Sequence, residues 1–218
     1  FITSTFSLIV NLTFIFGGIY NYIDILVRNY GYDANLTGLL FFGFLFIIND
    51  ILNIPFSLYK TFIIEEKFGF NKTTITTYLS DKLKGYFLAI LIGGPVLYLI
   101  LYFFSTYTSY GWLYVWMFLV SFSILMQPIF TTFIAPMFNK FTPLEDGPLL
   151  SRIKNYLKEV NFPVAKLEVI DGSKRSSHSN AYFSGIGKYK RIALFDTLLE
   201  QMNDDEILSI IAHEVGHY

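Results

Sequence analysis

The feature that most constrains this chain is a run of 55 residues, 85–139, without one charged side chain. As a single helix this run would be about 80 Å long, far more than the roughly 30 Å of hydrocarbon in a bilayer. Small, polar and aromatic residues at 105–111 interrupt it. The sequence therefore predicts two membrane spans, at about 86–104 and 112–133. Tyr107, Tyr110, Trp112 and Tyr114, at and next to the break, suit an interfacial aromatic belt.

Two more apolar stretches precede this run, at about 1–27 and 36–59, and each is long enough to cross a bilayer. Between the second and third spans, residues 60–84 carry five lysines and are expected to form a polar loop on the cytoplasmic side. Asp50 lies inside a span, where an acidic group is either buried beside a polar neighbour or functional. The sequence leaves both interpretations of Asp50 open.

The composition fits a membrane protein better than a soluble one. Hydrophobic residues make up 53% of the chain, and the mean hydropathy is +0.47. The net charge of -1 gives no basic field for a nucleic-acid partner. The chain has no cysteine, which excludes disulfides, thiolate zinc sites and a cysteine nucleophile.

Residues 140–218 have a different character, because they hold 10 of the 16 basic and 11 of the 17 acidic residues. An amphipathic helix is expected from Pro148, with Leu150, Ile153, Leu157 and Val160 on its buried face. Short strands are expected at 167–170, 180–184 and 191–195, the last two around a turn at 185–188. The sequence thus predicts a small α+β domain on the cytoplasmic side, after a helical membrane region at 1–139.

The strongest chemical signal is His213-Glu214-Val215-Gly216-His217, near the end of the chain. Residues four apart lie on the same face of a helix, so His213 and His217 can bind one metal ion. Glu214 can then take a proton from a metal-bound water and pass it to a leaving amine. The motif predicts a zinc hydrolase; the alternative is two ordinary histidines on a solvated helix face.

The residues before the motif favour a helix. Asn203 and Glu206 have the spacing of a capping box. The apolar positions Ile207, Leu208, Ile211 and Val215 form a stripe, and the two histidines lie to one side of it. Catalytic zinc usually has three protein ligands, and no credible third ligand precedes His213. Because the chain begins at Phe1 and stops one residue after His217, it is expected to be a truncated and inactive fragment.

Several stretches together resemble the type 1 CAAX prenyl proteases, integral-membrane zinc endopeptidases that process a-factor and prelamin. The residues that carry this resemblance are 62–71, 134–144, 171–183, 190–199 and 213–217. The resemblance implies a helical membrane barrel around a chamber, with a gluzincin-like α+β domain. It implies cleavage of the C-terminal tripeptide from prenylated CAAX proteins, with a second, upstream cleavage in some precursors.

The resemblance also assigns residues and a location. His213 and His217 would bind Zn2+, Glu214 would act as the general base, and a glutamate on a later helix would be the third ligand. Residues Asn180, Ala181 and Tyr182 match a strand that aligns the substrate by strand addition, although they are equally well explained as an ordinary sheet edge. His178 is interpreted as a loop histidine. The protein would lie among lipids in the endoplasmic reticulum membrane or the inner nuclear membrane.

Two other functions remain open at this point. A membrane protease of this class could instead clear non-prenylated or translocon-stalled proteins. A non-catalytic scaffold or channel is disfavoured, because a base retained beside two metal ligands has no purpose without catalysis.

Overall fold

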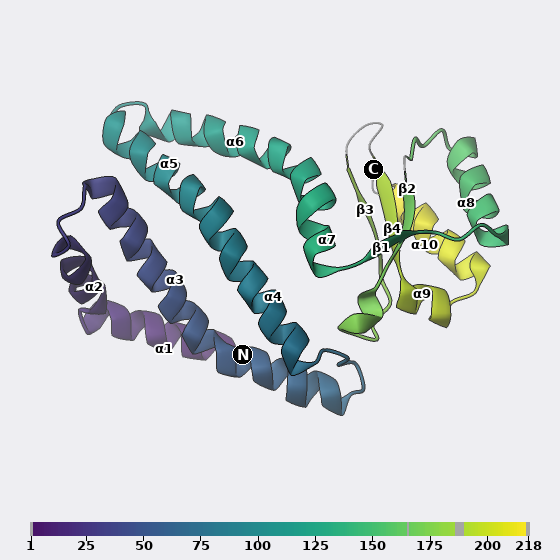
Figure 1. The fold of residues 1–218 in the computed structure, drawn as a ribbon, viewed down its shortest axis with the longest axis horizontal. Helices are drawn as coiled ribbons and strands as arrows, with labels where there is room; N and C mark the ends of the chain where they lie inside the picture. The colour runs from purple at the N-terminus through teal and green to yellow at the C-terminus, as the bar shows by residue number, and fades with distance from the viewer. Residues whose placement is uncertain (1, 165, 186–189, 217–218) are drawn as a thin grey trace. The chain divides into compact units, whose positions relative to one another are not determined.

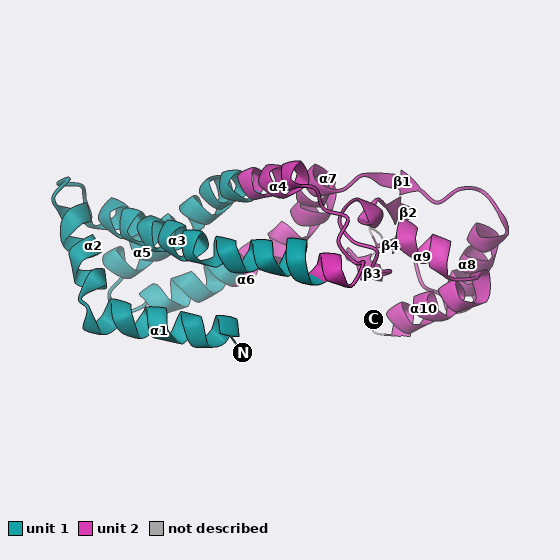
Figure 2. Cartoon of the chain, turned by 90° about the horizontal axis from the view of Figure 1, so that it is seen from below, with its two compact units in different colours: residues 1–64, 85–119 teal, residues 65–84, 120–218 magenta. Residues whose placement is uncertain are grey.

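The structure is a computed structural model that describes residues 2–164, 166–185 and 190–216. Two compact units make up the chain (Figure 1, Figure 2). We call residues 1–64 and 85–119 the helical unit, and residues 65–84 and 120–218 the sheet unit. His217 and Tyr218 lie outside the described residues.

Three helices are long and apolar enough to cross a membrane, and they have mean hydropathies of 1.9, 2.3 and 1.8. They span Ala34–Glu65, Ile75–Thr106 and Gly111–Phe138. Each contains one π-helical turn. Their segments are α3 (Ala34–Tyr59) with η1 (Lys60–Glu65), α4 (Ile75–Leu88) with η2 (Ala89–Gly93) and α5 (Gly94–Thr106), and α6 (Gly111–Ile129) with η3 (Phe130–Ile134) and α7 (Ala135–Phe138).

The span predicted at 1–27 differs from expectation, because it is broken into two helices. The segments α1 (Ile2–Phe16) and α2 (Ile19–Arg28) meet at an angle of 61°. Gly18 has a φ of 69°, a left-handed conformation that glycine adopts without steric cost and that ends a right-handed helix. Counted together, this bent pair gives a fourth candidate span.

The predicted polar loop at 60–84 is mostly helical. The helix that begins with α3 continues to Glu65, and α4 already begins at Ile75. The charged residues here mark where a helix passes beyond the apolar part of its sequence, not where its backbone hydrogen bonding stops.

Within the helical unit, α3 packs against α5. Its first turn is capped by Asp33, whose carboxylate accepts hydrogen bonds from the backbone N–H groups of Asn35 and Leu36. Asp50 accepts a hydrogen bond from the Tyr86 hydroxyl. This carboxylate therefore has the polar neighbour that the first of the two interpretations requires.

The sheet unit contains four strands in the order β1-β2-β4-β3. The central pair β2–β4 is parallel, and both outer pairs are antiparallel. Helices α8 and α10 pack on one face around a core that includes Ile153, Leu194, Ile207 and Ile211. The elements are β1 (Phe141–Pro143), α8 (Pro148–Glu159), β2 (Lys166–Ile170), η4 (Gly172–Lys174), β3 (Ala181–Ser184), β4 (Arg191–Phe195), α9 (Asp196–Gln201) and α10 (Asp204–Gly216).

The predicted strands match β2, β3 and β4 to within one residue at each end. Leu150, Ile153 and Leu157 are buried as expected, but Val160 is 44% exposed. The reason is that α8 ends at Glu159 and Asn161 then turns to a φ of 52°. Of the predicted turn at 185–188, residues 186–188 lie outside the described part of the chain.

Candidate active site

Helix α10 presents the His-Glu motif, and its start is fixed by the predicted capping box. The Asn203 side-chain oxygen accepts hydrogen bonds from the N–H groups of Asp205 and Glu206, at 3.0 and 3.1 Å. In return, the Asn203 N–H donates to the Glu206 carboxylate at 2.9 Å. This reciprocal pairing satisfies N–H groups that the first turn of a helix leaves without an internal partner.

The buried face of α10 determines where the motif residues point. Ile207 and Ile211 are 1% and 0% exposed. His213 follows Ile211 by two residues, or about 200° around the helix axis, so it lies on the opposite side from the core. Its side chain is exposed, and the neighbouring Glu214 is half-buried.

The residues on the last turn of α10 suit a zinc ion, since an exposed imidazole is an ordinary zinc ligand and the adjacent carboxylate can serve as a base. His217, the predicted second ligand, lies outside the described residues. Within 2–164, 166–185 and 190–216, no three His, Cys, Asp or Glu side chains gather closely enough to hold a metal. Glu214 and His213 are thus placed on one helical turn, and the ligand set stays a prediction.

The residues predicted to bind substrate lie at the edge of the sheet. Among the residues that the structure describes, strand β3 pairs only with β4, and it packs against α10, so β3 and the motif helix are neighbours. The Phe195 N–H donates to the Asn180 carbonyl at 3.0 Å. In an antiparallel pair every second residue bonds to the partner strand, so the backbone groups of Ala181 and Phe183 point to the open side.

Two side chains modify this edge. The Asn180 side-chain oxygen accepts a hydrogen bond from the Ala181 N–H at 2.9 Å, which covers one of the outward-pointing donors. Burial raises the pKa of the Tyr182 hydroxyl above 10.0; Arg191 opposes this rise, and Glu168 adds to it.

His178 lies in the loop before β3, as predicted, and it is exposed. Its ring stacks on Phe70 with 4.1 Å between centroids, and its carbonyl accepts a hydrogen bond from the Thr197 hydroxyl. Sequence reasoning gave no role to Arg175, three residues earlier, which forms a bidentate ion pair with Asp81. These two residues are 94 positions apart, and no local pattern in the sequence pairs them.

Comparison with known families identifies the chain. Residues 1–140 match the family described as the CAAX prenyl protease N-terminal region with five membrane helices. Residues 143–218 match peptidase family M48. The chain belongs to the CAAX prenyl protease family. It is accordingly an integral-membrane protein of a metallopeptidase family, mainly helical with a small α+β domain, which confirms the predicted fold class.

Relatives in this family cover most of the chain. CAAX prenyl protease 1 of Saccharomyces cerevisiae is 50% identical over 194 residues, which are 88% of this chain and 43% of that protein. The human CAAX prenyl protease 1 homolog is 36% identical over 209 residues, 79% of this chain and 44% of that protein. The crystal structure of S. mikatae Ste24p superposes with a TM-score of 0.93 at 41% identity, over 99% of this chain and 52% of that one. The chain thus spans less than half the length of these two curated relatives.

Proposed function

We propose that the full-length protein containing this chain is a zinc endopeptidase that removes the C-terminal tripeptide from prenylated CAAX proteins. A second cleavage, upstream in some precursors, belongs to the same proposal. The observation that carries it is the position of His213 and Glu214 on the last turn of a helix that packs against an open strand edge. The names of the relatives, CAAX prenyl protease 1 and its homologs, support the substrate class.

In the proposed reaction, His213 and His217 bind the zinc ion together with a third ligand from a later helix. When bound there, zinc would supply the positive charge that makes a water molecule easier to deprotonate. Glu214 accepts the proton of that water as its oxygen bonds to the carbonyl carbon of the scissile peptide. It then donates the proton to the amine nitrogen that leaves when the C–N bond breaks. With two histidines alone, the 218 residues are expected to bind zinc weakly and to release no tripeptide.

The substrate would bind as an extra strand beside β3. The outward N–H and C=O groups of Ala181 and Phe183 are free of β4, and they suit an extended peptide. For that peptide to use the Ala181 N–H, the Asn180 side chain must first release it. Strand pairing of this kind holds the peptide backbone straight along the sheet edge, next to the helix that carries Glu214.

The setting of the reaction follows from the membrane part of the protein. A prenyl chain partitions into lipid, so it brings the adjoining peptide bond to the surface of a membrane that holds the enzyme. We propose that residues 60–84, with their five lysines, and residues 140–218, with most of the basic residues, lie on the cytoplasmic side, where prenylated proteins occur. We propose the endoplasmic reticulum membrane or the inner nuclear membrane as the location.

The deciding experiment uses the full-length protein in liposomes with a farnesylated peptide that ends in a CAAX sequence. Release of the terminal tripeptide is expected, and a chelator or the variant Glu214→Gln should abolish it. Bound zinc should stay unchanged in Glu214→Gln, because Glu214 is not a ligand. Release that persists in this variant would contradict the role of Glu214.

A matched unprenylated peptide tests the substrate class separately. Preference for the farnesylated peptide is expected. Equal turnover of both peptides would retain the hydrolase but favour a quality-control protease that acts on non-prenylated or translocon-stalled proteins.

A further inference from the structure

The segment 171–180 connects β2 to β3 and therefore leads directly into the proposed substrate strand. Its only regular structure is the single turn η4. A side chain at Gly172 would collide with Phe195, since a Cβ there would lie 2.3 Å from the Phe195 ring. Because the segment has so little regular structure, contacts with other parts of the sheet unit must hold it in place.

On one side, α9 holds this segment. The Ser173 N–H donates to the Asp196 carboxylate at 2.8 Å, and the Ser173 hydroxyl bonds to the same group. Gln201 donates to the carbonyl of Ser177 at 2.9 Å. These contacts fix the segment to the element that follows β4.

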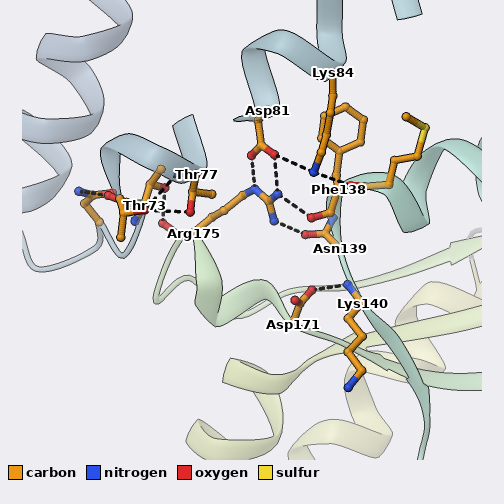
Figure 3. A network of polar contacts seen from close by, with 12 residues as sticks. Thr73, Thr77, Asp81, Lys84, Phe138, Asn139, Lys140, Asp171 and Arg175 are labelled. Carbon is orange, nitrogen blue, oxygen red and sulfur yellow. Dashed lines mark hydrogen bonds and ion pairs between the residues drawn. The ribbon is translucent and has the colours of Figure 1, made fainter. Parts of the chain in front are cut away.

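On the other side, the connection between the first two long helices holds it. The Arg175 carbonyl accepts a hydrogen bond from the Lys72 N–H at 3.0 Å. It also accepts one from the Thr73 hydroxyl at 3.0 Å (Figure 3). The Ser177 N–H donates to the Phe70 carbonyl at 3.0 Å. The segment is thus held between two parts of the chain that lie far from each other in the sequence.

The Arg175 side chain joins a third part of the chain to this arrangement. Its guanidinium donates to both oxygens of Asp81 on α4, at 2.7 and 3.0 Å. The same group donates to the carbonyl of Phe138 at 2.6 Å and to the side chain of Asn139 (Figure 3). Phe138 is the last residue of α7, where the helix leaves carbonyls without internal partners and where the dipole favours a cation.

The geometry of this cluster requires arginine. Four bonds from one planar group to four oxygens of three residues use the fork of a guanidinium, which the single ammonium of lysine cannot reproduce. The side chains of Arg175 and Asp81 are 25% and 24% exposed, so water screens the pair only in part. The Lys84 ammonium lies 3.9 Å from the Asp81 carboxylate and donates to the Met137 carbonyl. Among the described residues, it forms no hydrogen bond or ion pair with the segment 171–180.

We propose that Arg175 is a positioning residue for substrate binding, since it fixes the segment that sets the place of Asn180 and Ala181 at the open edge of β3. This inference rests on the proposed function. Arg175 lies on neither the metal helix nor β3 itself, so it acts through the strand that follows it. Its removal should weaken the docking of the peptide more than the chemical step.

The test measures KM and kcat for tripeptide release by the full-length protein in liposomes. Arg175→Met is expected to raise KM about tenfold and to leave kcat within about twofold. Bound zinc should not change. An unchanged KM, or a fall in kcat together with loss of zinc, would overturn the proposal, because the residue would then have no role or would support the metal helix.

Two more variants keep the test decisive if Arg175→Met folds poorly. Arg175→Lys retains the charge without the fork, and Asp81→Asn retains the size of the acceptor, so both should raise KM by a smaller factor. The double variant of Asp81→Asn and Arg175→Met should be no worse than Arg175→Met alone, because the two changes remove one shared interaction. Arg152→Met is the matched control: its partner Asp205 is 81% exposed, and KM should stay at the wild-type value.

Amide hydrogen exchange separates this proposal from the proposed function. Arg175→Met should speed exchange in residues 172–183 and leave the paired strands β2 and β4 unchanged. If the wild-type protein releases no tripeptide, the proposed function fails, and exchange alone then decides the positioning role. Exchange equal to that of wild type in residues 172–183 would overturn it.

Discussion

Arg191 on β4 donates a hydrogen bond of 2.6 Å to the carbonyl oxygen of Thr131, an acceptor inside the last long apolar helix. The helix itself cannot supply the usual donor there. The Ala135 N–H goes to the carbonyl of Phe130, and Pro136 has no N–H. A side chain of the sheet thus takes the place of a backbone donor that proline removes.

Replacement of Arg191 should therefore destabilise the protein. Its guanidinium also pairs with Glu168, each side chain is 12% exposed, and it lies 4.5 Å from the centre of the Phe141 ring. Arg191→Met leaves the Glu168 carboxylate without its main partner, and we expect a loss of about 3 kcal/mol in the free energy of unfolding. Denaturant unfolding in detergent, followed by tryptophan fluorescence, measures it. Arg152→Met is the control, because its partner Asp205 is 81% exposed; an equal loss there would contradict the argument.

The pairing of β3 predicts unequal effects for proline at two neighbouring positions. The Tyr182 N–H faces β4, so Tyr182→Pro should break a sheet hydrogen bond and destabilise the protein by about 3 kcal/mol. The Ala181 N–H faces the open edge and bonds only to the Asn180 side chain, so Ala181→Pro should break no bond to β4, destabilise the protein less and raise KM for the peptide. Unfolding curves and kinetics of both variants are the measurement. Destabilisation by both alike would show that the alternation of bonded and open residues is wrong.

Tyr182 on the edge strand should make the stability of the protein depend on pH in the alkaline range. Burial raises the pKa of its hydroxyl above 10.0, so above that pH the folded protein holds a proton that the unfolded chain releases. The stability from Tyr182 is therefore complete below pH 10.0 and is lost as the pH rises through the folded pKa. Unfolding measured between about pH 8 and 11 should show this loss in wild type and less of it in Tyr182→Phe. The same alkaline loss in both proteins would assign it to other groups.

The contribution of the capping box of α10 to the stability of the protein should be measurable by itself. Asn203→Ala removes the oxygen that accepts two N–H groups in the first turn of α10, and we expect a cost of about 1 kcal/mol. Asn203→Asp keeps an acceptor at the same place and should cost little. Unfolding curves test both, and equal destabilisation by the two variants would show that the cap is not the cause.

Patterns that act over a few residues predicted much of this fold. The alternation of apolar residues located β2, and the spacing of Asn203 and Glu206 located the start of α10. Both signals are local because strand alternation and capping depend on near neighbours. The helix that carries Glu214 could thus be inferred without a structure, while its metal ligands stay predicted.

Features that depend on distant partners could not be predicted in this way. Arg175 and Asp81 lie 94 residues apart, and Arg191 and Thr131 lie 60 apart. Polarity was also ambiguous: the lysines of residues 60–84 indicated a loop, whereas the backbone stays helical to Glu65. Charged residues show where a helix meets water, but they do not show where its backbone hydrogen bonds end.

The open edge of β3 has a consequence for selectivity. Its outward groups, those of Ala181 and Phe183, are backbone N–H and C=O, and every extended peptide offers the same groups in return. Backbone hydrogen bonds do not distinguish one side chain from another, so they would hold a substrate sequence and a non-substrate sequence with similar strength. In the proposed enzyme, these backbone bonds supply affinity without discrimination, so selection rests on what surrounds the side chains of the peptide and on which peptides reach the edge. A lipid tail that delivers the peptide would provide such a selection without any sequence-specific pocket along the strand.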